Sequence, residues 1–598
     1  MNENKSPLAH PIDAQLILRK KVALKKKLLA KNNFLEIRIA IVGGSTTSEI
    51  KNILELFLLD AGIKPNFFEG EYNQYFEELF FENKLLKKFN PEVILIHTTE
   101  KNIKHYPIPS DTKETVDNLL KYEIERLQAI WQKATQNFKC TVIQNNFEFP
   151  LSRPLGNLDC SFHSGKTLFI NNLNKSMVEF KESNKNFYIN DINYLASWLG
   201  LERWHNLDDW TASKYAIGYE LIPYHSLNLA SIIKGIYGKN KKGLILDMDN
   251  TLWGGVIGDD GIEGIKIGTE TAVSESYLNF QRYILELKSR GIMLSVASKN
   301  DIDNALNGLS HKDSLLSKED FISIQANWNP KPNSISEIAK DLNIGLDSLV
   351  FIDDNPSERD IVRQMQPAVS VPDVGADVNQ FIKIIDKSGL FESHEMSSDD
   401  ISRNSYYEQN QKRDTFSLTF EDYSEYLKSL KMVATIENFK EINLSRITQL
   451  VNKTNQFNLT TKRYSPAEIE EVYRGENYIA LSGRLQDKFG DNGLISIIIG
   501  SIKNQHLKIE LWVMSCRVIK REMEYAMLES LIKECTKKSI KSISGKYIPS
   551  LKNNMVKNLY HDLGFKKQDD THENYDLFYI DLKNIKHLPV HQIRIKNE

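Results

Sequence analysis

The chain has 598 residues, more than one hydrophobic core can organise, so we expect several domains. A net charge of −3 provides no broad basic field, so charge gives no reason to expect nucleic acid as a partner. No apolar run approaches the roughly 20 residues that a membrane span needs. The four cysteines are too few for a disulfide framework. We therefore predict a globular, cytoplasmic protein without a membrane span.

The first segment is rich in lysine and includes Lys20-Lys21 and Lys25-Lys26-Lys27 within a leucine and alanine pattern. It is followed by neither the apolar h-region nor the small-residue cleavage site of a signal peptide. We therefore predict a helical extension over residues 1–36. A role for this helix at a membrane surface remains an alternative.

Strands then alternate with helices in two successive segments, residues 37–240 and 241–390, and this alternation is typical of α/β domains with parallel sheets. In the first segment we predict strands at 37–42, 93–96 and 140–143 and helices at 48–61 and 116–138. In the second we predict strands at 243–247, 292–297, 321–325, 349–352 and 369–371 and helices at 271–290, 301–309 and 334–342.

The polar stretch 391–430 predicts a helical connector. Over residues 431–598 the pattern changes to long strands at 478–484, 495–501 and 506–514, which precede a helix at 521–537. This order indicates an α+β domain. The sequence as a whole therefore predicts a multidomain α/β protein.

Two carboxylates stand two residues apart at the end of an apolar strand: Asp247 and Asp249, in the run LILDMDNTLW. Because side chains alternate along a strand, both carboxylates point the same way. Two like charges so close repel each other unless a cation neutralises them. The pair suggests a divalent metal and offers a carboxylate nucleophile beside a second acid, as phosphoryl transfer requires. The alternative is a solvated turn.

Three further pieces follow in order at predicted strand or loop ends: Ser298 with Asn300 in VASKN, Lys331 in NPKP, and Asp353-Asp354 in FIDDN. A hydroxyl near a helix start can hold a phosphoryl oxygen, and a lysine suits developing phosphoryl charge. Alone, these residues read as a helix cap, a surface lysine and a turn. Parallel strands bring their ends to one edge, so together they predict a phosphotransfer site. Mg²⁺ suits it, because Mg²⁺ prefers oxygen ligands.

The spacing between the Asp247/Asp249 pair and Ser298 limits the size of any domain inserted above this site. From Asp249 to Ser298 there are 298 − 249 = 49 positions. A loop and one helix occupy much of this length, so a large cap domain is not expected there. An open site suits a bulky substrate such as a carrier protein, or covering by another domain of the chain.

The spelling DMDNTLWGG resembles motif I of the haloacid dehalogenase (HAD) phosphotransferases, and the continuation GGVIGDDG is similar to the FkbH-like branch. The resemblance implies that Asp247 attacks phosphorus and forms an aspartyl-phosphate. Asp249 would act as acid and base, and Ser298, Asn300 and Lys331 would hold the phosphate. The implied Mg²⁺ ligands are Asp247, Asp249, Asp353 and Asp354, with the Met248–Asp249 backbone contributing.

The resemblance continues in KTNQFNLT (453–460), DKFGDNG (487–493) and SCRV (515–518), and residues 547–565 resemble the end of an acetyltransferase-like (GNAT) fold. Family members with assigned roles load glyceryl groups from 1,3-bisphosphoglycerate onto acyl carrier proteins, and a cysteine thioester is thought to carry the group. Cys516 is the candidate thiol, since Arg517, Lys520 and Arg521 follow it and nearby cations lower a thiol pKa. The alternative is a structural cysteine.

Two departures from the family pattern bear on function. Family members commonly show CSKN at the second motif, whereas Ala297 precedes Ser298 here. Gly44-Ser45-Thr46-Thr47 faintly resembles the nucleophile turn of SGNH hydrolases, but His205 and Asp208 stand in reverse order and His225 lacks an aspartate three residues earlier. We therefore expect an SGNH-hydrolase-like domain without a complete triad, whose role would be to dock the carrier.

These observations predict an SGNH-like domain at 37–240, a HAD-like domain at 241–390, a connector at 391–430 and a GNAT-like domain at 431–598. The predicted activity is a Mg²⁺-dependent phosphatase coupled to transfer of a glyceryl or related acyl group. The acceptor would be the phosphopantetheine arm of an acyl carrier protein, in polyketide, nonribosomal peptide or surface-glycan synthesis. The alternatives are a phosphatase of small phosphoesters and a non-catalytic carrier-docking protein.

Overall fold

The computed structural model describes residues 6–31, 34–81, 83–393, 396, 398–550, 552–568, 575–585 and 590–596. The predicted extension 1–36, connector 391–430 and C-terminal domain 431–598 each include residues outside this description. The chain forms two compact units, one comprising Ser6–Gly235 with Ser465–Glu468 and the other comprising Ile236–Tyr464 and Ile469–Glu598. The finer division into three globular domains stays a prediction.

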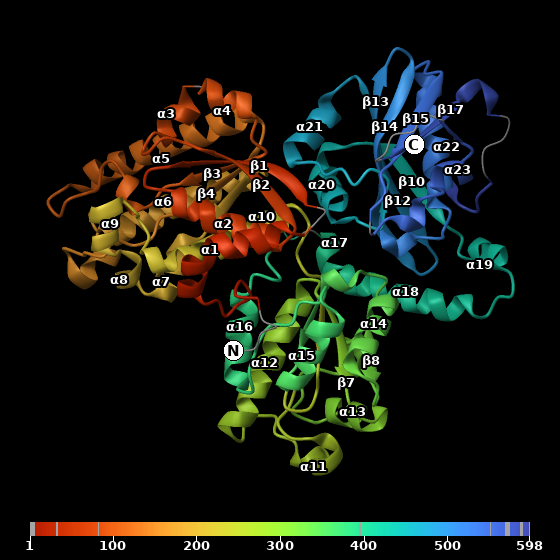
Figure 1. Cartoon of the computed structure of the whole chain (residues 1–598), viewed down its shortest axis with the longest axis horizontal. Coiled ribbons are helices and arrows are strands. Elements are labelled where there is room, and N and C mark those ends of the chain that lie inside the picture. The colour runs from red at the N-terminus through yellow and green to blue at the C-terminus, as the bar shows by residue number, and fades with distance from the viewer. Residues whose placement is uncertain are drawn as a thin grey trace. The chain divides into compact units, whose positions relative to one another are not determined.

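The N-terminal unit is built on a parallel sheet, as predicted, and this sheet has five strands where the sequence predicted three (Figure 1). Its order is β2 (Ile63–Glu69), β1 (Leu35–Gly43), β3 (Val93–His97), β4 (Thr141–Asn145) and β5 (Phe187–Asn190). The main helices are α1 (Ala14–Leu29), α2 (Ser48–Asp60), α5 (Lys113–Phe138), α6 (Lys166–Ser183) and α10 (Ile222–Ile236). Shorter helices are α3 (Tyr75–Phe80), α4 (Lys84–Phe89), α7 (Ile192–Leu199), α8 (Leu201–Trp204) and α9 (Leu207–Ser213).

The predicted lysine-rich helix is α1, and it packs along α2 (Figure 1). Ile17 is fully buried on its inner face. Two of its lysines pair with glutamates of α2: Lys21 Nζ lies 2.7 Å from Glu49 Oε1, and Lys25 Nζ lies 2.6 Å from Glu55 Oε2. Part of the lysine pattern therefore attaches the helix to its own unit. Every helix within the described residues is too short or too polar to cross a bilayer.

The second unit contains a four-stranded parallel sheet in the order β8 (Ser323–Ala326), β7 (Met293–Ser298), β6 (Gly243–Leu246) and β9 (Leu349–Ile352). Its helices are α11 (Ile257–Gly264), α12 (Ala272–Ser289), α13 (Ile302–Leu309), α14 (Lys331–Asp341), α15 (Pro356–Met365) and α16 (Phe381–Lys387). The strand predicted at 369–371 is instead an isolated bridge between Val350 and Ser370. Pro367 and Pro372 flank it, and proline cannot donate a ladder hydrogen bond.

The two edges of this sheet carry different chemistry. All four strands are parallel, and Leu246 of β6 lies beside Ile352 of β9. Asp247 and Asp353 therefore follow directly at the carboxyl-terminal edge. At the other end Gly243 lies beside Leu349, so Lys242 and Ser348 precede the strands at the amino-terminal edge. A ligand at one edge is separated from the other edge by the length of the sheet.

The C-terminal part of this unit holds a nine-stranded sheet, in which β11 (Phe457–Asn458) pairs with β14. The remaining order is β16 (Lys566–Lys567), β17 (Asp576–Asp581), β15 (Ser542–Tyr547), β14 (His506–Met514), β13 (Gly490–Lys503), β12 (Tyr478–Asp487), β10 (Val433–Asn438) and β18 (Arg594–Lys596). The helices are α17 (Ser398–Ile401), α18 (Arg403–Ser417), α19 (Tyr423–Ser429), α20 (Leu444–Lys453), α21 (Pro466–Arg474), α22 (Met523–Lys537) and α23 (Leu559–Asp562). Within the described residues of the predicted connector, helices α17, α18 and α19 alternate with turns and irregular segments.

Candidate active site

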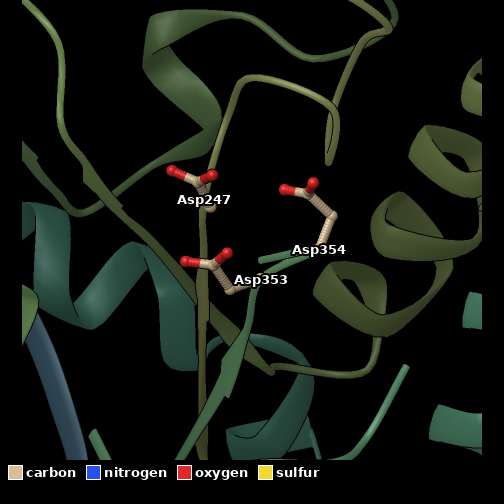
Figure 2. Close-up of side chains that lie close together, drawn as sticks. All are labelled: Asp247, Asp353 and Asp354. Carbon is tan, nitrogen blue, oxygen red and sulfur yellow. The ribbon is translucent and has the colours of Figure 1, made fainter. Parts of the chain in front are cut away.

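Three carboxylates converge at the carboxyl-terminal edge of the four-stranded sheet, as Figure 2 shows. Asp247 follows β6, and Asp353 and Asp354 follow β9. One oxygen from each lies within 4.8 Å of the others. Asp353 is fully buried and Asp247 nearly so. Several acidic oxygens around one partly enclosed point are what a small divalent cation such as Mg²⁺ prefers, so the residues present fit such an ion.

Lys331 supplies positive charge to this cluster when no metal ion is bound. It begins α14, and its Nζ lies 2.7 Å from Asp247 Oδ1 and 2.5 Å from Asp353 Oδ2. Burial on its own lowers the pKa of Lys331, but the two carboxylates outweigh burial and raise the pKa. Lys331 therefore stays charged and lies where a phosphoryl group bound at Asp247 would carry negative charge.

The acidic groups are crowded enough to change their titration. Burial, followed by repulsion from Asp247, raises the pKa of Asp353 to about 6 even though Lys331 opposes the shift. The same two causes, burial and Asp247, raise the pKa of Asp354. A bound divalent cation would remove this repulsion, because it favours the ionised form of each carboxylate.

Asp249 lies outside the group of three carboxylates, although we predicted it as a fourth metal ligand. Its Oδ1 accepts hydrogen bonds from Trp253 Nε1 at 2.9 Å and from the Ile257 amide at 3.1 Å. Its Oδ2 accepts from Asn300 Nδ2 at 3.1 Å. Burial raises the pKa of Asp249, and the bonds from Ile257 and Trp253 oppose that rise. These three hydrogen bonds hold the Asp249 side chain in one orientation, and its role in proton transfer stays a prediction.

The turn after β6 contains two residues that position the site, Asn250 and Thr251, and the sequence analysis assigned them no role. Asn250 has a φ of 55°, and its Oδ1 accepts a hydrogen bond from the Gly255 amide at 2.9 Å. Thr251 Oγ1 accepts from the Asp354 amide at 3.3 Å and so joins the first carboxylate turn to the last. The only available signal was their presence within DMDNTLWGG, because their contacts arise from tertiary structure.

In the VASKN motif, Ala297 and Ser298 at the end of β7 point to opposite faces of the sheet. Ser298, its last residue, is buried at the carboxyl-terminal edge, and Asn300 beyond it reaches Asp249. Ala297 is fully buried and belongs to the hydrophobic cluster that includes Ile335 and Ile338 of α14. Adjacent strand residues point to opposite faces. Position 297 therefore faces the core beneath α14, where a cysteine side chain would be packed away from the Ser298 face.

Cys516 does not join this cluster. It lines a pocket together with Lys242 and Ser348, at the amino-terminal edge of the same sheet. Asn343 Nδ2 donates a hydrogen bond to its carbonyl at 3.0 Å. The structure thus brings together the predicted residues Asp247, Asp249, Ser298, Asn300, Lys331, Asp353 and Asp354, and it separates Cys516 from them by the length of the sheet.

The N-terminal unit does not join its serine to either histidine through a hydrogen bond among the described residues. Ser45 Oγ is buried with no hydrogen-bond partner there. His205 Nε2 lies 2.8 Å from the Phe149 carbonyl oxygen, and His225 Nε2 lies 3.2 Å from Asn190 Nδ2. These polar groups are enclosed within the unit, so the arrangement gives no support to a hydrolytic site in it.

Comparisons with known proteins agree with the geometry. Residues 38–234 match the model of a family described as FkbH, N-terminal domain. The chain is similar to the solved N-terminal part of the protein BF1531 from Bacteroides fragilis, which contains a phosphatase domain and was complexed with Mg. Identity is 26%, the TM-score is 0.58, and the likeness covers 63% of this chain and 99% of that chain. The predicted multidomain α/β class with a phosphatase-type fold is confirmed.

Acetyltransferases match with much lower TM-scores. The ribosomal-protein-S18-alanine N-acetyltransferase of Escherichia coli is 16% identical, with a TM-score of 0.21, and the likeness covers 25% of this chain and 94% of that chain. For the spermidine N-acetyltransferase of Vibrio cholerae the values are 15%, 0.21, 25% and 96%. At these TM-scores neither likeness bears on fold or activity, so the GNAT-like domain stays a prediction. No curated protein matches the chain.

Proposed function

We propose that this chain, which carries an FkbH N-terminal domain over residues 38–234, is a Mg²⁺-dependent phosphatase that also transfers an acyl group to a carrier protein. The observation that carries the phosphatase half is the convergence of Asp247, Asp353 and Asp354, with Lys331 forming ion pairs to Asp247 and Asp353. The Mg bound to the similar phosphatase domain of BF1531 supports the choice of ion.

Asp247, Asp353 and Asp354 would hold the ion, together with the Asp249 backbone. Bound there, Mg²⁺ supplies positive charge that stabilises the oxygens of a phosphoryl group in transit. The Asp247 carboxylate attacks phosphorus, the ester oxygen leaves as an alcohol with a proton from Asp249, and an aspartyl-phosphate forms. Asp249 then takes a proton from a water molecule whose oxygen attacks phosphorus, the bond between phosphorus and the Asp247 oxygen breaks, and phosphate is released with Asp247 restored. Lys331, Ser298 and Asn300 bind and orient the phosphoryl oxygens.

Substrate chemistry assigns the two phosphates of 1,3-bisphosphoglycerate to different steps. Attack on phosphorus at the acyl phosphate would release a free carboxylate and lose the activated acyl group. We therefore infer that the Asp247 site removes the phosphoester phosphate. The acyl carbon is left for a thiol, and acyl transfer from phosphate to sulfur preserves the activation.

Cys516 is the proposed thiol for that second step. A carbon–sulfur bond forms, the bond from the acyl carbon to the phosphate oxygen breaks, and the thiol proton leaves with the released phosphate. The glyceryl thioester then exchanges onto the phosphopantetheine thiol of an acyl carrier protein. The partly exposed Cys516 side chain, in a pocket rich in basic residues, supports this role.

A second candidate is a phosphatase that acts on small phosphoesters without acyl transfer. The position of Cys516 at the sheet edge opposite Asp247 favours it, because no single bound substrate pose serves both residues.

Intact-mass spectrometry and phosphate release with 1,3-bisphosphoglycerate and Mg²⁺, with and without a cognate holo carrier protein, test both candidates. We expect a glyceryl adduct and a loaded carrier for the unaltered chain. The Cys516→Ala variant should release the phosphoester phosphate but form neither adduct nor loaded carrier, while Cys160→Ala, at an exposed cysteine elsewhere, should behave as the parent. Phosphate release without adduct or loaded carrier in the parent would favour the simple phosphatase.

A further inference from the structure

An exposed tryptophan lies in the loop between β8 and α14, at the edge of the sheet that carries the carboxylate cluster. Trp328 is 70% exposed, whereas the other six tryptophans of the chain, all among the described residues, are buried or half-buried. Its loop is attached to the end of β7, because the Asn327 amide donates a hydrogen bond to the Ser298 carbonyl at 3.1 Å. Three residues further on, Lys331 forms its ion pairs with the cluster. The indole therefore belongs to the border of the proposed phosphatase site.

Hydrogen bonds hold this indole and connect it to Asp249. Trp328 Nε1 donates to Asp301 Oδ1 at 3.0 Å. The Asp301 amide donates to Asn300 Oδ1 at 3.0 Å, and Asn300 Nδ2 donates to Asp249 Oδ2 at 3.1 Å. The polar edge of the indole is thus bonded to the protein, while much of its apolar surface is in contact with water. Because the ring is already oriented, a ligand that stacks on it causes little further loss of side-chain freedom.

The connection to Asp249 indicates which part of a substrate meets the indole. In the proposed reaction, Asp249 gives its proton to the ester oxygen that leaves with the organic group. This oxygen must therefore come within hydrogen-bond reach of the Asp249 carboxylate. Trp328 is connected to the same carboxylate through Asn300 and Asp301. A substrate that reacts in this way would direct its organic group, and not its phosphoryl group, toward the indole.

Two more exposed apolar side chains lie at the same border. Ile302 follows Asp301 directly and begins α13. Val256 precedes Ile257, whose amide donates to Asp249 Oδ1 at 3.1 Å. Helices α11 and α13, at whose starts these side chains lie, pack against each other (Figure 1). The chain from β6 to β7, all of it described, forms α11, α12 and their loops, so no inserted domain covers this apolar border.

The charges next to the indole disfavour an anionic organic group. Lys299 is the cation of the segment 299–303, and its Nζ lies 2.6 Å from Glu358 Oε1. The same segment carries two exposed carboxylates, Asp301 and Asp303. These carboxylates would repel a further negative charge placed beside the indole. An uncharged group is therefore the better match for this surface.

We propose that Trp328 is a specificity-determining residue of the carboxylate site and stacks on an uncharged planar group, such as an aromatic ring or an amide, in the organic part of the phosphoester. Asp301 is a positioning residue, since it acts through the indole that it orients. The inference rests on the proposed phosphatase function and adds a substrate class to it. A planar group covers the indole face and gains from stacking, whereas a phosphoester without such a group leaves the indole in water.

Two phosphonates test this inference without turnover, because phosphoester hydrolysis does not cleave their carbon–phosphorus bond. Benzylphosphonate adds a phenyl ring to the group that methylphosphonate presents alone. In calorimetric titrations of the full chain with Mg²⁺, benzylphosphonate should bind about tenfold more tightly than methylphosphonate. Binding of both should be lost when a chelator removes Mg²⁺, which distinguishes the carboxylate site from binding elsewhere.

Variants assign the difference between the two affinities to the indole. In Trp328→Ala the ratio should fall several-fold, and Asp301→Ala should lower it less. Asp301→Asn should keep the parent ratio, because its amide oxygen can still accept from the indole. Phe81→Ala, which removes an exposed ring of the N-terminal unit, should keep it as well.

Acrylamide quenching of tryptophan fluorescence is the second readout, because the quencher reaches the exposed Trp328 more readily than the other indoles. Saturation with benzylphosphonate and Mg²⁺ should reduce quenching, and methylphosphonate should change it little. Equal affinities in the parent, an unchanged ratio in Trp328→Ala or quenching unaffected by benzylphosphonate would overturn the inference and leave the phosphatase proposal intact. If neither phosphonate bound, the proposed function would fail and this inference with it.

Discussion

At the residue scale, Lys331 has two opposing effects on the carboxylate cluster. Its ammonium group lies 2.7 Å from Asp247 Oδ1 and 2.5 Å from Asp353 Oδ2, so it compensates charge that is removed from water. The same positive charge competes with a divalent cation for those oxygens. The residue therefore stabilises the protein without metal and weakens metal binding at the same time.

Replacing Lys331 by Met should separate these effects. Without metal, the variant should lose about 3–5 kcal/mol of stability, because the buried carboxylates lose their cation. Its affinity for Mg²⁺ should rise, while phosphate release should fall. Urea unfolding with chelator and calorimetric Mg²⁺ titration measure the two quantities. Lys340→Met is the matched control, since Lys340 lies on the same helix and is mostly exposed. Unchanged or weaker Mg²⁺ binding in Lys331→Met would contradict this account.

Replacing Asp249 should distinguish its role in proton transfer from a role in metal binding. In Asp249→Asn the amide oxygen can still accept from Trp253 and the Ile257 amide, so the turn should keep its shape. Because the side chain lies outside the group of three carboxylates, the Mg²⁺ Kd should change little. Phosphate release should fall about 10²–10⁴-fold, the usual contribution of a positioned general acid and base. A large loss of Mg²⁺ affinity would instead identify Asp249 as a side-chain ligand.

At the element scale, the strands that the sequence predicted correctly are short apolar runs, such as β6, β7 and β9. The prediction missed β2, which alternates polar and apolar residues and contains Pro65, and it placed a strand at 369–371 between two prolines. The carboxylate cluster was predictable because each motif lies just beyond a strand or at a helix start. The position of Cys516 was not, since it depends on tertiary contacts of the segment after β14, such as the hydrogen bond from Asn343 to the Cys516 carbonyl, rather than on local pattern.

The sheet of the N-terminal unit carries a buried polar network that should respond to acid. His97 Nδ1 lies 2.9 Å from Asn145 Nδ2, and burial lowers the pKa of His97 to about 4. Burial also lowers the pKa of His225, whose ring lies 5.3 Å from that of His97. In the unfolded chain histidine titrates near pH 6.5. Between about pH 6.5 and 4 the unfolded chain therefore binds protons at these histidines that the folded unit does not bind. Their contribution to the free energy of unfolding thus falls as the pH falls through this window.

A His97→Gln variant should lack the part of this acid-induced loss of stability that His97 causes. The stability of the parent relative to the variant should decline as pH falls from 7 to 4, by about 3 kcal/mol in total for a fully buried group. Hydrogen exchange of peptides from β3 and β4 at several pH values measures this difference within the unit. The comparison with a variant is needed because burial raises the pKa of Glu148 to about 8, which gives the parent an opposite slope. A pH-independent difference would contradict the assignment.

At the scale of the whole molecule, the proposed function uses two groups that lie at opposite edges of one sheet in the second unit. The carboxylate cluster follows β6 and β9, whereas the pocket that Cys516 lines lies where these strands begin. A substrate with two phosphates can engage only one edge at a time. If both sites act, the acyl group must be taken up at one edge and dephosphorylated in a separate binding event.

This separation predicts the composition of a trapped intermediate. In Asp247→Asn the phosphoester should remain intact, while Cys516 should still attack the acyl phosphate, because its cavity does not include position 247. Intact-mass spectrometry with 1,3-bisphosphoglycerate should then detect an adduct heavier than glyceryl by one phosphoryl group. The double variant Asp247→Asn/Cys516→Ala should form none. If Asp247→Asn alone abolished every adduct, acylation would depend on the carboxylate cluster and the two edges could not act independently. A glyceryl adduct without the phosphoryl group would show instead that phosphoester hydrolysis does not require the Asp247 carboxylate.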